Sequence, residues 1–152
     1  MMHFASEADL VAPFREIDRA EVEQPDKQRF PLQVEDDVFT WSAGPRAFLV
    51  FRDRTDRPLR GIVFHRSTQA MPDVAAMCEW CHAVRGNGGV KLLTAASSSR
   101  RHVGLYLCSD LSCVEKTRAV PGPDDLQENL DSRARLEKVV ARISTFASRR
   151  LY

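Results

Sequence analysis

The sequence of 152 residues lacks any long hydrophobic run. Its longest apolar segments, such as the one from Ala47 to Phe51, are far shorter than the ~20 residues that span a bilayer as a helix. The first residues, Met1 to Glu7, have neither the basic region nor the apolar region of a secretory signal. We therefore expect no transmembrane segment, no membrane partner and a cytoplasmic location.

Recognisable catalytic motifs are also missing. The sequence contains no Ser-His-Asp pattern, no glycine loop of the kind that cradles a phosphate, and no paired acid motif. These absences predict that the protein is not an enzyme and takes no small-molecule substrate.

An excess of charge of one sign is absent too, because the net charge is only +1. The strongly basic composition that is typical of nucleic-acid-binding domains is therefore missing. The charge is nevertheless uneven: residues 1–40 hold four Lys/Arg against ten Asp/Glu, and residues 41–118 hold twelve against six. Either the acidic start neutralises the basic middle within the fold, or the middle faces an acidic partner, which could be nucleic acid or protein.

Cysteine is scarce, and the few cysteines fall into two short motifs, Cys78-Glu79-Trp80-Cys81 and Cys108-Ser109-Asp110-Leu111-Ser112-Cys113. A tetrahedral zinc ion takes four thiolates, and two pairs from tight turns complete a closed site. We predict one structural Zn²⁺. Its predicted ligands are Cys78, Cys81, Cys108 and Cys113. Two disulfides, which need an oxidising compartment, and a thiol redox switch are the alternatives.

The elements predicted around these motifs follow a fixed order: the turn from Cys78 to Cys81, called the knuckle here, then a hairpin, then a helix. Residues 90–94 and 102–107 have the apolar content of strands, and a Gly-rich turn signal precedes the first. Ser112 and Glu115 form a capping box, which places Cys113 in the first turn of a helix that runs to about Ala119. This order is that of a treble-clef zinc finger. Four cysteines fill the site, so neither His82 nor His102 is expected to bind the metal.

The remaining segments predict helices at both ends and strands before the cysteines. Ser6 is expected to cap a short helix through Val11. Either this helix breaks at Pro13, or Pro13 begins a second helix over Phe14 to Val22. The side chains of Phe14, Ile17 and Val22 are expected to face inward. After a connector over 24–31, strands are predicted at 37–41, 46–52 and 59–66.

The longest predicted helix starts at Asp124 or Asp125 and carries one apolar stripe. The stripe comprises Leu126, Leu130, Leu136, Val139, Val140, Ile143 and Phe146. The predicted fold class is α+β, in which an N-terminal helical segment and a small antiparallel sheet precede a treble-clef zinc finger with four cysteine ligands and a long C-terminal helix. The predicted units are 1–73, 74–120 and 121–152, the last packing on the rest.

With these residues in place, the sequence resembles the fusidic-acid-resistance and elongation-factor-G-binding protein family, which has a C-terminal treble-clef zinc finger. The likeness is closest from Met77 to about Arg118, in the first cysteine pair and in the run from Val103 to Cys113. It implies a non-enzymatic protein that binds elongation factor G, with Cys78, Cys81, Cys108 and Cys113 as metal ligands.

If the family's partner is also that of this chain, cationic residues of the finger are expected to face acidic patches on it. These residues are Arg85, Lys91, Arg101, Lys116 and Arg118. Direct binding of RNA or of the ribosome by the basic middle region is the alternative function, and it predicts binding that weakens steeply with salt.

Overall fold

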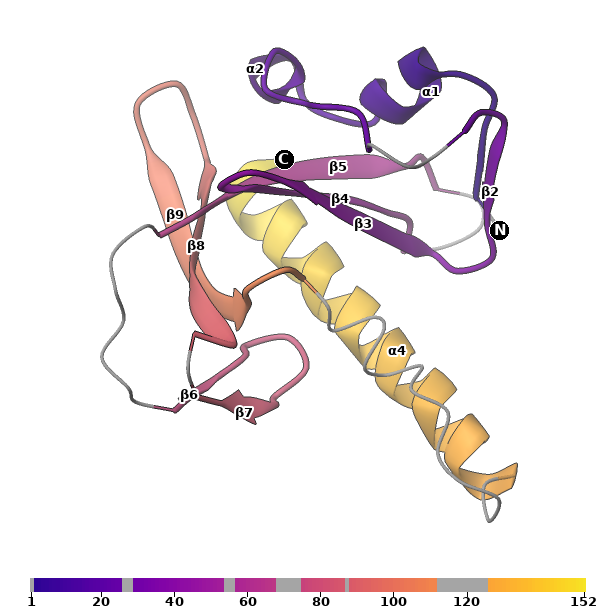
Figure 1. The fold of residues 1–152 in the computed structure, drawn as a ribbon, viewed down its shortest axis with the longest axis vertical. Helices are drawn as coiled ribbons and strands as arrows, with labels where there is room; N and C mark the ends of the chain where they lie inside the picture. Colours follow the sequence, from indigo (N-terminus) through magenta and orange to yellow (C-terminus); the bar gives the residue numbers. More distant parts are fainter. Residues whose placement is uncertain (1, 26–28, 54–56, 68–74, 87, 112–125) are drawn as a thin grey trace.

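A five-stranded antiparallel sheet forms the centre of the computed structural model (Figure 1). The structure describes residues 2–25, 29–53, 57–67, 75–86, 88–111 and 126–152, and within the last range it describes side chains from residue 134. The sheet has the order β3-β4-β5-β8-β9. Its strands are β3 (Val38–Ala43), β4 (Arg46–Phe51), β5 (Arg60–Arg66), β8 (Val90–Ala96) and β9 (His102–Cys108).

Two small sheets and three helices complete the described part. The first small sheet pairs β1 (Met2–Phe4) with β2 (Leu32–Val34), and the second pairs β6 (Ala76–Met77) with β7 (Val84–Arg85). The helices are α1 (Glu7–Val11), α2 (Glu16–Arg19) and α4 (Leu126–Phe146), and α4 continues into a π-helical turn, η1 (Ala147–Leu151). None of the described helices combines the length and the apolar character that crossing a membrane requires.

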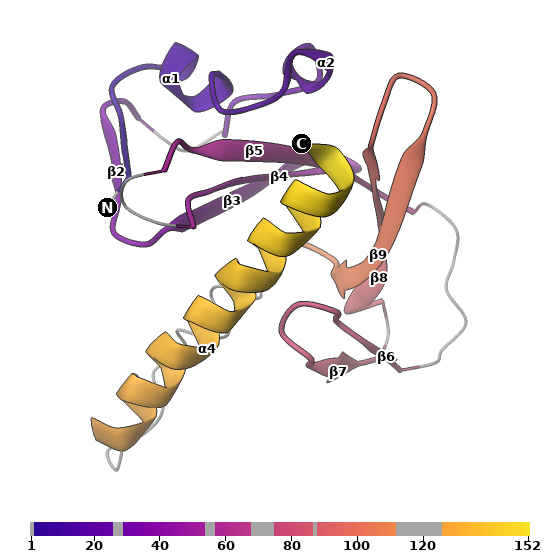
Figure 2. The same ribbon diagram turned by 180° about the vertical axis from the view of Figure 1, so that it is seen from behind.

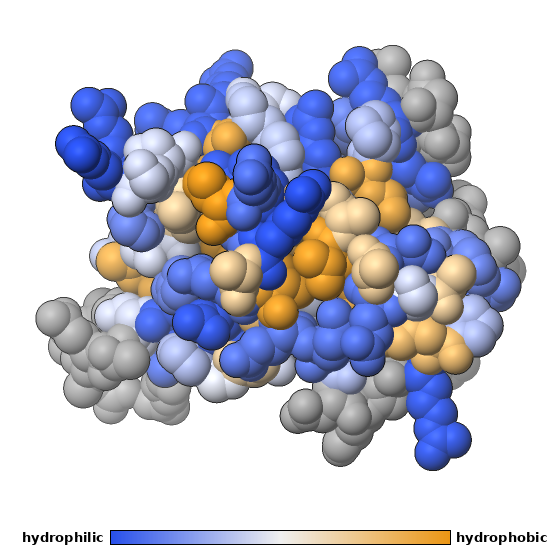
Figure 3. Space-filling model, turned by 90° about the horizontal axis from the view of Figure 1, so that it is seen from above, coloured by the Kyte–Doolittle hydropathy of each residue, from blue (hydrophilic) through white to orange (hydrophobic). Residues whose placement is uncertain are grey.

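The part of the central sheet formed by β3, β4 and β5 is covered on both faces. Helices α1 and α2 lie on one side of β3, β4 and β5, and α4 crosses the other side (Figures 1 and 2). Successive side chains of a strand point to opposite faces, so Phe48 and Val50 of β4 join the N-terminal core cluster, while Leu49 and Phe51 join the cluster beneath α4. Seen from above, hydrophilic residues cover most of the surface and apolar residues show between them in smaller patches (Figure 3).

The three strands predicted before the cysteines are confirmed as β3, β4 and β5, and the two predicted after the knuckle as β8 and β9. The predicted small sheet needs correction, because the fold is rich in sheet. His65 and Arg66 of β5 pair with Thr94 and Leu93 of β8, so the hairpin of the finger extends the same sheet. The sheet therefore joins strands from both sides of residue 73. The division into the three units 1–73, 74–120 and 121–152 stays a prediction.

The N-terminal helices match the prediction only in part. Helix α1 begins after Ser6 as expected, but α2 is a single turn that begins at Glu16, and Ile17 is 49% exposed instead of facing inward. Asp18 is buried in its place, since the Arg15 guanidinium lies 2.8 Å from the Asp18 carboxylate. Burial raises the pKa of Asp18, and the hydrogen bond from Arg15 opposes that rise. Sequence analysis also missed β1, which pairs with β2 after the predicted connector.

The apolar stripe of the C-terminal helix is confirmed where side chains are described. Val139, Val140 and Ile143 are buried, and Leu136 and Phe146 pack against the same cluster. The side chains of Leu126 and Leu130, the predicted start at Asp124 or Asp125, and the predicted helix over 112–119 lie outside the described residues.

The end of the C-terminal helix is fastened to β5. The Tyr152 hydroxyl donates a hydrogen bond to the Gly61 carbonyl at 2.8 Å, and the Arg15 guanidinium donates to the Leu151 carbonyl at 3.1 Å. The guanidinium carbons of Arg15 and Arg60 lie 5.7 and 5.2 Å from the centre of the Tyr152 ring. These contacts fix the angle at which α4 leaves the sheet, and thereby position the helix beside the finger.

Gly61 offers a test of the packing between the N-terminal segment and β5. A Cβ atom at this position would lie 2.6–2.8 Å from carbons of the buried Phe14 ring. We expect Gly61→Ala to lower the free energy of unfolding of the zinc-loaded protein by about 1–3 kcal/mol in urea titrations, because the ring must move. Gly86→Ala is the control, since a Cβ there meets nothing within 4 Å. Equal unfolding midpoints for the two variants would contradict the packing described.

Candidate metal centre

Three cysteines meet at one point of the finger. The Sγ atoms of Cys78, Cys81 and Cys108 all lie within 4.8 Å of one another, and those of Cys81 and Cys108 are 3.6 Å apart. Thiolates bound tetrahedrally at about 2.3 Å from zinc are about 3.8 Å apart, so this spacing fits a shared metal ion. It also excludes a disulfide between Cys81 and Cys108, whose sulfurs would be about 2.05 Å apart.

The first two sulfurs come from the knuckle that joins β6 to β7. Met77 pairs with Val84 in the two strands, the Cys78 amide donates to the Ala83 carbonyl, and the His82 amide donates to the Cys78 carbonyl. His82 closes this turn with a φ of 63°, in the left-handed region. The hydrogen bonds bend the chain back within six residues, which brings Cys81 beside Cys78.

The third sulfur comes from the end of β9. There the Ser109 amide donates to the Gly89 carbonyl and the Leu111 amide donates to the Cys108 carbonyl, so the chain turns directly after Cys108. Leu111 has a φ of 57° and is buried in the main core cluster. Cys113, the fourth predicted ligand, lies outside the described residues. The described cluster consists of Cys78, Cys81 and Cys108.

Burial makes negative charge on these thiolates energetically costly. Cys78 and Cys108 are fully buried, and both belong to the main hydrophobic cluster. Three ionised thiolates packed together in such a place need a compensating cation. Zinc suits the donor set, because thiolates are its preferred ligands in structural sites.

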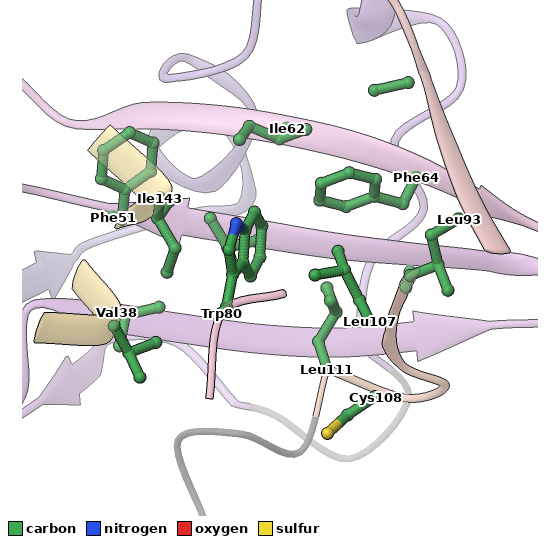
Figure 4. Close-up of a cluster of buried hydrophobic side chains, with 14 of the residues drawn as sticks. Val38, Phe51, Ile62, Phe64, Trp80, Leu93, Leu107, Cys108, Leu111 and Ile143 are labelled. Carbon is green, nitrogen blue, oxygen red and sulfur yellow. The ribbon is translucent and has the colours of Figure 1, made fainter. Parts of the chain in front are cut away.

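Trp80 connects the knuckle to the core (Figure 4). It lies between the two cysteines of the first pair in sequence, is only 3% exposed, and packs edge-on against Phe64 and Phe146 with ring centres 5.6 and 6.1 Å away. The Arg142 guanidinium of α4 donates a hydrogen bond to the Trp80 carbonyl. The knuckle is thus held from the sheet by ring packing and from α4 by a charged hydrogen bond.

The residues predicted to contact the partner lie at different places in the structure. Arg85 in β7 and Lys91 in β8 are half-buried near the knuckle, and the stem of Arg85 lies against Gly89. Arg101 is exposed before β9, at the end of the hairpin opposite Cys108, about 20 Å away along the strand. Lys116 and Arg118 lie outside the described residues.

Sequence analysis missed a cleft between the knuckle and α4. Its volume is about 600 Å³, and its walls include Glu79 and Trp80 from the knuckle and Lys138 and Arg142 from α4. Lys138 and Arg142 are four residues apart, which places both on one side of a helix. This spacing was the signal in the sequence that could have indicated the basic wall of the cleft. The sequence alone did not show that this side faces the knuckle.

The position of Trp80 gives a direct readout of metal binding. Removing the metal with a chelator should loosen the knuckle, because structural zinc sites carry folding free energy, and should expose the Trp80 indole to water. In Trp41→Phe, whose remaining tryptophan is Trp80, we expect the fluorescence maximum to move to longer wavelength on chelation and to return with added zinc. In the control variant Trp80→Phe, Trp41 reports the N-terminal cluster and should move less. An unchanged spectrum of Trp41→Phe would contradict the coupling.

Comparison with known proteins yields one family. The chain matches the family described as FBP C-terminal treble-clef zinc-finger over residues 14–149. No curated protein and no solved structure gives a significant match. The family and the cysteine cluster together point to one structural zinc ion, as predicted. The match confirms the resemblance found from the cysteine motifs, and the chain belongs to the FBP C-terminal treble-clef zinc-finger family.

Proposed function

We propose that this protein binds elongation factor G, free or on the translating ribosome, as a non-enzymatic cytoplasmic protein. The observation that carries the proposal is the family match over 14–149 together with the thiol cluster. The same match supports a binding role over an enzymatic one at the level of the family. Zinc holds the finger in the shape that contacts the partner.

We further propose that Cys78, Cys81, Cys108 and Cys113 are the four zinc ligands. The convergence of the first three sulfurs supports their assignment. Cys113 is proposed from its place in the second motif. Four thiolates leave no coordination position for water or substrate, so a zinc ion held in this way stabilises the finger and performs no hydrolysis.

Exposed apolar side chains on the finger favour a protein partner over nucleic acid. Val84 and Met77, which are paired across β6 and β7, are 66% and 52% exposed, and Tyr106 of β9 is 44% exposed. The Tyr106 amide donates to the Glu79 carboxylate, so the tyrosine lies next to the knuckle. Apolar and aromatic residues at a surface are typical of the centre of a protein interface, whereas phosphate binding relies on clustered cations.

Cobalt substitution tests the ligand set. Cobalt(II) replaces zinc in thiolate sites, and its charge-transfer absorption grows with the number of bound thiolates. We expect Cys113→Ser to lower that absorption by about one quarter, since three of four thiolates remain. His82→Asn is the control, because asparagine tolerates the left-handed backbone at this position, and it should leave the spectrum unchanged. A wild-type spectrum for Cys113→Ser would remove Cys113 from the ligand set.

Calorimetric titration tests the function. Zinc-loaded wild-type protein and His82→Asn should both bind purified elongation factor G of the same organism saturably at micromolar concentration or below. Cys113→Ser should bind at least about tenfold more weakly, because the finger loses part of its fold with the metal ligand. If the wild-type protein gives no heat of binding at micromolar concentration, the proposal is wrong. Binding to ribosomal RNA in its place, with steep salt dependence, would favour the alternative function.

A further inference from the structure

The cleft between the knuckle and α4 is basic at its rim and apolar at its floor. Apolar and neutral lining comes from Trp80, Leu105, Ala141, Thr145 and Phe146. Charged lining comes from Glu79, Lys138, Arg142, Arg149 and Arg150. Four cations against one carboxylate give the cleft a strong positive field, although the whole chain carries a net charge of only +1.

The opposite side of α4 has the reverse charge. A second cleft of about 770 Å³ is lined by acidic residues together with Leu136, Val140, Ala141 and Ser144 of the helix. The acidic residues are Glu35, Asp36, Asp37, Asp53 and Glu137. Ala141 borders both clefts, so α4 forms the wall between a basic and an acidic side. The cations that line a cleft along α4 therefore lie on the side of the helix that faces the finger.

The cations at the rim are available to a partner. Lys138, Arg149 and Arg150 are exposed, and within the described ranges the ion pairs involve other residues: Arg15 with Asp18, Arg46 with Glu23, Arg52 with Asp37, and His65 with Glu21. Arg142 differs, since it holds the Trp80 carbonyl. Arg142 thus builds the cleft, and the other three cations supply charge that the described chain leaves uncompensated.

We propose that this basic cleft is the docking site for an acidic segment of the protein partner. Carboxylates of the segment would face Lys138, Arg149 and Arg150, and an apolar side chain would cover Leu105 and Phe146. The inference rests on the proposed function and locates it on α4 and the knuckle, away from Arg101 at the tip of the hairpin. The apolar floor disfavours a phosphate backbone, which gains nothing from apolar contact.

The cleft depends on the metal, because one of its walls is the knuckle itself. Glu79 and Trp80 lie between Cys78 and Cys81 in the sequence, and both line the cleft. When the knuckle loses its metal, the wall opposite α4 loses its position. Docking of the acidic segment is therefore a property of the zinc-loaded form.

Charge reversal at the rim tests the docking site. The variant Lys138→Glu with Arg149→Glu changes two exposed cations that make no described contact within the fold. We expect its affinity for elongation factor G to fall about tenfold or more, and to fall less for Lys138→Gln with Arg149→Gln, which removes charge without reversing it. Arg29→Glu with Arg57→Glu is the matched control, since it makes the same change in net charge at two exposed arginines elsewhere, and it should bind like the wild-type protein. Zinc content and thermal midpoint establish that each variant is folded.

The outcomes separate this inference from the proposed function. If the wild-type protein binds elongation factor G and both charge-reversed pairs weaken binding equally, only net charge matters and the docking site is wrong. If neither pair weakens binding, the docking site is wrong and the proposed function stands. If the wild-type protein does not bind elongation factor G, the proposed function fails and the inference falls with it. If the rim pair loses affinity for single-stranded RNA but not for elongation factor G, the cleft binds nucleic acid and the inference is overturned.

Discussion

The packing of Trp80 is the contact on which the rest of the finger depends. Strands β6 and β7 are two residues long each, too short to hold a hairpin by their own hydrogen bonds. A metal ion fixes the sulfurs relative to one another but does not orient the knuckle on the protein. Trp80 supplies that orientation, since its ring contacts Phe64 of the sheet and Phe146 of α4 together. The finger is therefore part of the core instead of a tethered loop.

The same contact couples the metal to the stability of the whole described fold. The main core cluster runs without interruption from β3 and β4 through Phe64 and Trp80 to Cys108 and Ile143. Fully buried thiols at the edge of such a cluster cannot separate without disturbing the residues around them, because protein interiors are close-packed. A structural zinc ion here does more than fold a local loop. It closes one end of a core that begins in strands far upstream in the sequence.

Local patterns predicted the parts of this protein that depend on neighbouring residues. Spacing indicated which cysteines share a site, β-branched and aromatic content located β4 and β5, and a period of three to four identified the buried stripe through Val139 and Ile143. The pairing of Arg66 with Leu93 depends on which distant strand lies alongside, and no local pattern encodes that. The prediction that Ile17 faces inward was wrong for a similar reason. The side of α2 that carries Asp18 faces the core, because Arg15 pairs with the Asp18 carboxylate and also donates to the distant Leu151 carbonyl.

Charge counts along the sequence could not reveal the basic cleft, and the geometry of α4 explains why. Consecutive residues of a helix point about 100° apart, so the neighbours Glu137 and Lys138 line opposite clefts although their charges cancel in any count. The contrast between an acidic start and a basic middle is a poor guide to the surface for the same reason, since Asp37 and Asp53, from either side of that division, line the same acidic cleft. The surface of this nearly neutral protein therefore differs in charge between the two sides of α4. The knuckle determines which side is walled into a cleft that combines positive charge with an apolar floor.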